Sequence, residues 1–179
     1  PRLMNVIPGE DGYPATIEIT LPAAMTAIPF GASEAEVVAE HGDGTKTWRY
    51  ETNSAGGILY AGDYVREEIQ AGGLTIDFYY GRKHQAVMEA AGAAEAVRAV
   101  VDYCAGHYGP LSFGGGARLK LIQSRVTGGG YAVDGASLLD EADFTAHNLG
   151  DAGKGGGAAE VMIHELVHPV SYTHLRAHE

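Results

Sequence analysis

Two histidines and a glutamate near the end of the chain have the types and spacing of a metal site. They stand in the run His164-Glu-Leu-Val-His168. On a helix, residues four apart share one face and lie about 6 Å apart along the axis, so both imidazoles could reach one tetrahedral zinc ion. Glu165 stands about 100° round the helix from His164, beside such an ion rather than on it. The run therefore predicts His164 and His168 as metal ligands and Glu165 as a general base.

This arrangement predicts zinc-dependent hydrolysis of a peptide bond, with Glu165 activating a zinc-bound water. Zinc lowers the pKa of its water from near 16 to about 7. Glu165 would take the proton as the water attacks the carbonyl, and would pass it to the leaving amine. We therefore expect one Zn²⁺ ion as the cofactor and a peptide as the substrate.

The motif requires a helix, and the sequence predicts one that begins near residues 157–158. Val161, Met162, Leu166 and Val167 would seat it between neighbouring elements. The glycine-rich residues 150–157 before it lack the Gly-Lys-Ser/Thr ending of a phosphate-binding loop, so we expect them to be a connection only.

Upstream of the motif, residues 1–83 show the period-two alternation of short strands, most clearly at 16–21, 45–51 and 74–80. Glycine-rich turns separate them, which is typical of an antiparallel sheet or sandwich. Residues 84–108 change to helical spacing and end at Gly109-Pro110. Within that helix Cys104 is expected to be a small buried hydrophobe. A strand at 118–126, a glycine-rich loop at 128–132 and a short segment at 136–144 follow.

Charge and hydropathy exclude some partners. With 23 acidic against 12 basic residues the formal net charge is −11, which gives no support to nucleic-acid binding. Neither a signal peptide nor an apolar run long enough to cross a membrane is visible in these residues. We expect a bacterial cytoplasmic or membrane-associated location; the oligomeric state is not readable.

From about residue 16 to residue 168 the chain resembles the M1 family of gluzincin zinc aminopeptidases. The resemblance rests on the order of the elements and on the stretches 99–110, 119–126 and 161–168. It implies an α+β fold, in which residues 1–83 end a β-rich, sandwich-like N-terminal domain. Residues 84–169 would then begin a thermolysin-like catalytic domain. The resemblance also implies zinc ligation by His164 and His168, with Glu165 as the base.

The family's substrate loop is altered here. M1 aminopeptidases carry a Gly-x-Met-Glu-Asn loop whose glutamate holds the free amine of the substrate, whereas this chain reads Gly128-Gly-Gly-Tyr-Ala-Val133. The resemblance implies substrate binding by Gly129, Gly130, Tyr131 and Ala132, whose backbone could pair with an extended peptide. A divergent M1-like peptidase, of the type attached to bacterial membrane transporters, fits this loop better and implies a link to a membrane protein.

The family's third zinc ligand, a glutamate, would lie beyond residue 179. Residues 170–179 resemble translated sequencing-adapter text, and Pro169 would disrupt a continuing helix. We therefore expect a fragment that is truncated just after the motif, with a non-native tail and no activity of its own.

Two other interpretations remain open. A metzincin-type endopeptidase would take His174, six residues beyond His168, as its third ligand, but Ser171 stands where that class needs a glycine for its turn. Alternatively, the β-rich half and an incomplete zinc site could form a non-catalytic binding module of a membrane-associated assembly.

The variant His174→Ala separates the first of these from the M1 interpretation. If His174 is a third ligand, the variant loses bound zinc; in an M1-like chain the zinc affinity stays unchanged. Metal content after dialysis measures the difference.

Overall fold

The computed structural model describes residues 14–29, 31, 33–52, 59–111, 116–125, 130–133, 135–142 and 164. The chain forms two compact units, Pro1–Tyr64 and Val65–Glu179. Strands predominate and helices are few, as the α+β prediction requires.

The first unit contains two small antiparallel sheets. One has the strand order β1-β4-β3, with β1 at Ala15–Pro22, β4 at Thr45–Thr52 and β3 at Glu36–Glu40. In the other, β2 (Thr26–Pro29) pairs with β5 (Leu59–Gly62). The strands predicted at 16–21 and 45–51 are confirmed. Ile19 stands opposite Trp48 in the antiparallel register, so apolar residues from both strands share one face.

The second unit is built on a five-stranded mixed sheet with the order β6-β7-β8-β10-β9. Its strands are β6 (Tyr64–Ala71), β7 (Leu74–Gly81), β8 (Arg118–Ser124), β9 (Gly130–Val133) and β10 (Ala136–Asp140). β8 runs parallel to both β7 and β10, whereas β9 is antiparallel to β10. The strands predicted at 74–80 and from 118 onward are therefore confirmed.

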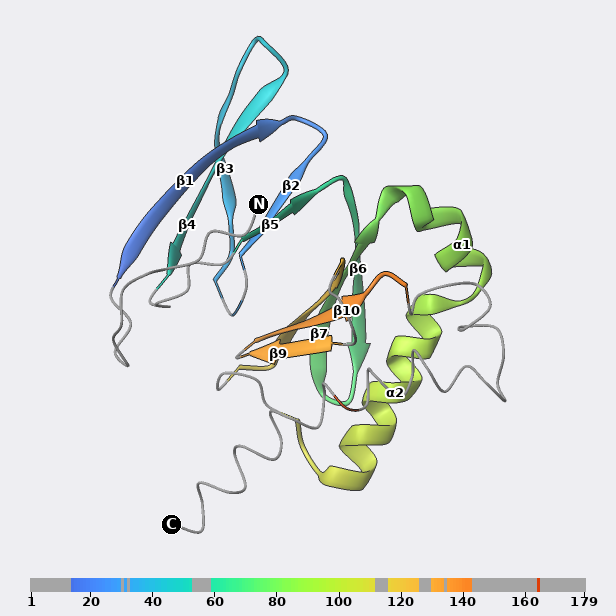
Figure 1. Ribbon diagram of the computed structural model, residues 1–179. Coiled ribbons are helices and arrows are strands. Elements are labelled where there is room, and N and C mark those ends of the chain that lie inside the picture. Colours follow the sequence, from blue (N-terminus) through green and yellow to red (C-terminus); the bar gives the residue numbers. More distant parts are fainter. Residues whose placement is uncertain are drawn as a thin grey trace. The chain divides into compact units, whose positions relative to one another are not determined.

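The chain returns from β7 to β8 through a 3-10 turn, η1 (Arg82–His84), and two helices, α1 (Gln85–Ala90) and α2 (Ala93–Tyr108) (Figure 1). The sequence predicted one helix over 84–108. The helix is divided because Gly92, just before α2, has a φ of +65°, a conformation outside the right-handed helix. The predicted end at Gly109 is confirmed, since α2 closes there with a φ of +87°.

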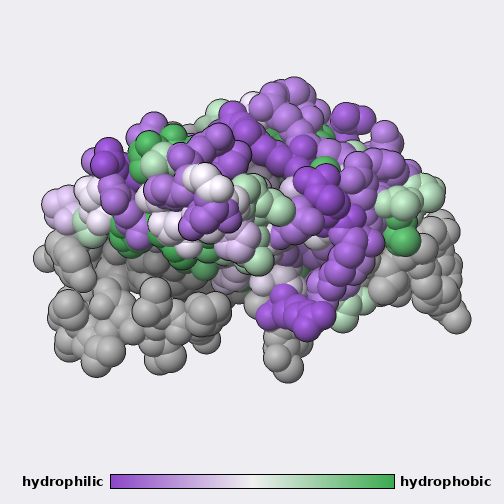
Figure 2. Space-filling view, turned by 90° about the horizontal axis from the view of Figure 1, so that it is seen from above, coloured by the Kyte–Doolittle hydropathy of each residue, from purple (hydrophilic) through white to green (hydrophobic). Residues whose placement is uncertain are grey.

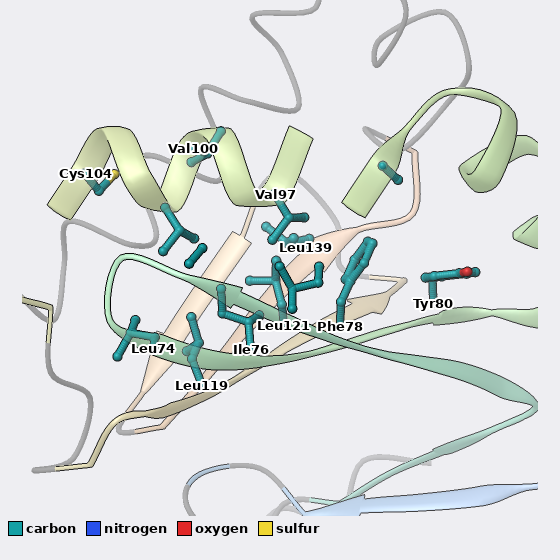
Figure 3. Close-up of a cluster of buried hydrophobic side chains, with 14 of the residues drawn as sticks. Leu74, Ile76, Phe78, Tyr80, Val97, Val100, Cys104, Leu119, Leu121 and Leu139 are labelled. Carbon is teal, nitrogen blue, oxygen red and sulfur yellow. The ribbon is translucent and has the colours of Figure 1, made fainter. Parts of the chain in front are cut away.

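The hydrophobic core lies between the helices and one face of this sheet (Figure 3). Alternate residues of β7, among them Leu74, Ile76 and Phe78, point towards Val97 and Cys104 of α2. Cys104 is fully buried, as predicted, and burial raises the pKa of its thiol. The central strand β8 is buried on both faces, which is typical of a strand with parallel neighbours.

The β6–β7 hairpin packs its turn against α2. Gly72 and Gly73 both have positive φ, at +57° and +81°, as a two-residue type I′ turn requires. The backbone N–H of Gly72 donates to Oδ1 of Asp102 at 2.7 Å. A Cβ added at Gly72 would lie 3.0 Å from side-chain atoms of Ala105 and Val101 on α2, so the approach leaves no room for a side chain.

Asp77 lies on the face of the sheet opposite the hydrophobic core. Its carboxylate is fully buried and accepts hydrogen bonds from Arg66 on β6 at 2.6 and 2.8 Å. It also accepts bonds from Arg118 on β8 at 2.5 and 2.7 Å. Both guanidinium groups remain about half-exposed, so one buried anion joins three adjacent strands through charge-assisted bonds.

Besides the divided helix, one further feature differs from the sequence analysis. The segment predicted as a glycine-rich loop over 128–132 is wrong for its second half, because Gly130–Val133 form strand β9. Backbone pairing with β10 overrides the weak strand propensity of glycine there. The compact units divide after Tyr64, and β7 pairs directly with β8. The domain boundary expected at residue 83 stays a prediction. Assignment of these parts to named peptidase domains stays a prediction.

The face of the molecule in Figure 2 is mostly hydrophilic, with apolar residues in small separate patches. Neither α1 nor α2, the helices within the described part of the chain, has the length and apolar character that crossing a membrane requires.

Substitutions in the hairpin turn separate backbone strain from crowding. A Cβ added at Gly73 would have no atom within 4 Å. Gly73→Ala should therefore lower the unfolding free energy by about 1–2 kcal/mol through the strain of its positive φ alone. Gly72→Ala has the same strain and also meets α2, so we expect a further loss of about 1–3 kcal/mol. Urea unfolding followed by circular dichroism measures both; equal losses would contradict the close packing.

Asp77→Asn should lower the unfolding free energy by about 2–3 kcal/mol, because the amide cannot replace the charge-assisted bonds to two arginines. A matched control is Glu18→Gln, which removes the exposed Glu18–Arg49 pair, 2.7 Å long, between β1 and β4. That pair should be worth less than about 1 kcal/mol. An Asp77→Asn variant no less stable than the control would refute a structural role for the buried carboxylate.

Candidate functional site

His164 is the one residue of the predicted zinc motif that falls within the described part of the chain. Its backbone is helical and its side chain is exposed. The helical backbone is what the spacing argument requires at this position, and the exposed imidazole is accessible to an ion. Glu165 and His168 lie outside the described residues, as does the alternative ligand His174, so their roles stay predictions.

The predicted substrate segment lies at the edge of the five-stranded sheet. Gly129 is outside the described residues, whereas Gly130, Tyr131 and Ala132 belong to β9. In the antiparallel register Gly130 stands opposite Leu139 and Ala132 opposite Ser137 of β10. Because β9 ends the strand order, its backbone groups on the outer side face no other strand of the described sheet. An edge of this kind can pair with an extended peptide.

Two other histidines have structural partners. Nδ1 of His107 lies 2.8 Å from the carbonyl of Tyr103, and the two rings stack with centroids 3.8 Å apart. Oε1 of Gln123 accepts a hydrogen bond from the backbone N–H of Gly81 at 3.0 Å. Nδ1 of His84 lies 3.0 Å from the same oxygen, which can only accept, so Nδ1 must be the donor of that bond. The sequence analysis assigned neither histidine a role, and these contacts fit a structural one.

A charged cluster that the sequence analysis missed joins the carboxyl ends of the parallel strands. Glu141, just after β10, accepts a hydrogen bond from Nε of Arg125 at 2.7 Å and forms an ion pair with Nζ of Lys83 at 3.3 Å. The bond from Arg125, with a smaller contribution from Lys83, lowers the pKa of the Glu141 carboxyl below its ordinary value. Glu141 therefore stays ionised in more acidic solution than a free glutamate. No local pattern could find this cluster, because its members are far apart in the sequence.

The donor chemistry of the motif fits zinc. Two imidazole nitrogens are ordinary zinc ligands, and a carboxylate one residue after the first can serve as a base. Within the residues that the structure describes, no group of three or more histidine, cysteine, aspartate or glutamate side chains could hold a metal ion.

Comparison with known proteins finds solved structures with a partly similar fold. No protein-family model matches the chain, and no curated protein matches its sequence. An M1 zinc metallopeptidase from Deinococcus radiodurans is 19% identical with a TM-score of 0.48, and the alignment covers 86% of this chain but 33% of that one. A two-domain M1 zinc metallopeptidase mutant bound to L-arginine is 16% identical with a TM-score of 0.46, covering 84% and 33%.

This chain thus spans about one third of the length of the solved structures that it resembles. Those structures are M1 zinc metallopeptidases. The function of this chain is argued from its own residues.

Proposed function

We propose that this chain is part of a zinc-dependent metallopeptidase of the M1 type, which hydrolyses peptide bonds. The observation that carries the proposal is the run His164-Glu-Leu-Val-His168, whose spacing on a helix would put two imidazoles one turn apart with a carboxylate beside the ion that they hold. The helical backbone at His164 supports the geometry on which this spacing depends.

Each motif residue has one task in the proposed reaction. His164 and His168 would hold the ion through ring nitrogens. Glu165 accepts a proton from the attacking water and delivers it to the leaving amine, so a single carboxylate serves both halves of the reaction. When bound, zinc supplies Lewis acidity that lowers the pKa of a water to about 7. The third ligand belongs to residues beyond 179, as the family resemblance implies.

In this proposal the substrate binds along the edge strand β9. Those backbone groups of Gly130, Tyr131 and Ala132 that point away from β10 would pair with an extended peptide, which would add to the sheet beside β9. Backbone pairing does not read side chains, so this edge would position many sequences alike. Because no glutamate stands in residues 128–133, capture of a free amino terminus is not part of the proposal. The choice between exopeptidase and endopeptidase therefore depends on other residues.

His164→Ala and His168→Ala should each weaken zinc binding to this chain by at least about tenfold. Even outer partners of metal ligands change affinity by about 10–100-fold, so removal of a ligand itself should cost no less. Competition against a chromophoric chelator measures the affinity without requiring turnover. His107→Ala is the matched control, since that imidazole is engaged with Tyr103 on α2.

Glu165→Gln completes this experiment. It should keep the zinc affinity, because Glu165 is not a ligand. In the longer natural protein that the proposal requires, it should slow peptide hydrolysis by about 10²–10⁴-fold through loss of the base. Unchanged zinc affinity in both His164→Ala and His168→Ala would refute the proposed site.

A further inference from the structure

The proposed peptide edge is attached to the sheet through a single strand. β9 ends the described strand order, and its neighbour there is β10. Four residue pairs, from Ala136–Val133 to Leu139–Gly130, join these two short strands. The position of the β9 edge therefore depends on how β10 is held against β8.

Backbone bonds hold both ends of β10. Before the strand, the carbonyl of Gly135 accepts from the N–H of Lys120 at 2.9 Å. After it, the N–H of Glu141 donates to the carbonyl of Ser124 at 2.8 Å, so the pairing with β8 continues one residue beyond Asp140. Both ends thus follow β8, and the second end also carries a side-chain attachment.

That attachment is the carboxylate of Glu141. It reaches Arg125, which directly follows β8, and Lys83 of η1, two residues beyond the end of β7. The side chain of Glu141 is 24% exposed, against 57% for Lys83 and 81% for Arg125. The anion is therefore the sheltered centre of the cluster, and both cations reach it from solvent. One residue connects the carboxyl ends of three parallel strands.

We propose that Glu141 is a positioning residue, which holds β10 and with it the β9 edge in place for an extended peptide. This inference rests on the proposed function, since it takes β9 as the peptide-binding edge. Leu138 and Leu139 of β10 are almost fully buried, so the strand stays in the fold without the ion pairs. What the carboxylate restricts is local opening of the outer two strands.

The size of the effect follows from the exposure of the partners. Ion pairs with exposed partners contribute about 0.2–1 kcal/mol, which corresponds to about a 1.4- to 5-fold change in an opening equilibrium. Glu141→Gln should therefore speed hydrogen exchange of the amides in residues 130–140 by about two- to fivefold. Residues 118–124 of β8 should exchange at the wild-type rate. Glu18→Gln, which removes a comparable exposed pair on β1, is the matched control and should change nothing in residues 130–140.

Peptide binding provides a second readout, which a merely structural role would not move. Tetra-alanine amide, whose side chains are minimal, should protect residues 130–133 from exchange in the wild-type chain. The half-protecting concentration should rise about two- to fivefold in Glu141→Gln, and Glu141→Asp should restore part of the difference.

The outcomes separate the two ideas. Unchanged exchange of residues 130–140 in Glu141→Gln overturns the positioning role, and so does a rise that extends equally into residues 118–124. An unchanged half-protecting concentration overturns it as well, while the peptide edge stands. Absence of protection by tetra-alanine amide in the wild-type chain overturns the use of β9 as a peptide edge, and with it this part of the proposed function.

Discussion

Parallel pairing of β7 with β8 is the constraint on which the second unit depends. Two neighbouring strands that run in the same direction require the chain to cross back along the sheet, and a helix is the usual way to make that return. Here α1 and α2 make it, so α2 comes to lie over the face that carries Leu74, Ile76 and Phe78. A strand between two parallel neighbours has no solvent face, and β8 is accordingly buried on both sides.

The same constraint explains where the charges lie. Asp77 stands on the face away from the helices, fully buried, and a buried carboxylate without partners would cost several kcal/mol. Arg66 and Arg118 come from the strands on either side of β7, so they meet it across the sheet rather than along the chain. At the carboxyl ends of the parallel strands, Glu141 meets cations that follow β7 and β8 in the same way.

Strands and helices whose signal lies in neighbouring residues were predicted correctly. Features that depend on partners distant in the sequence were not. Alternation of residue types at 16–21, 45–51 and 74–80 identified strands, because successive side chains of a strand point to opposite faces of its sheet. The helical pattern of 84–108 could not show the interruption, since apolar spacing continues across Gly92 while its backbone turns left-handed. β9 was missed because it is short and begins within a run of glycines, and its pairing with β10 cannot be read from the local sequence. For the candidate site, the His164 motif could be proposed because its residues are close together in the sequence, whereas the Glu141 cluster joins residues that only the folded sheet brings together.

The burial of Cys104 gives the chain an internal reporter. It is the one cysteine among 179 residues, it lies on the inner side of α2, and the raised pKa of its thiol suppresses the reactive thiolate. A thiol reagent can reach this sulfur only when α2 separates from the sheet. The rate of labelling therefore measures how often that interface opens, with no engineered residue. Slow modification of Cys104 would mark intact packing of α2, the helix that the hairpin turn at Gly72 touches.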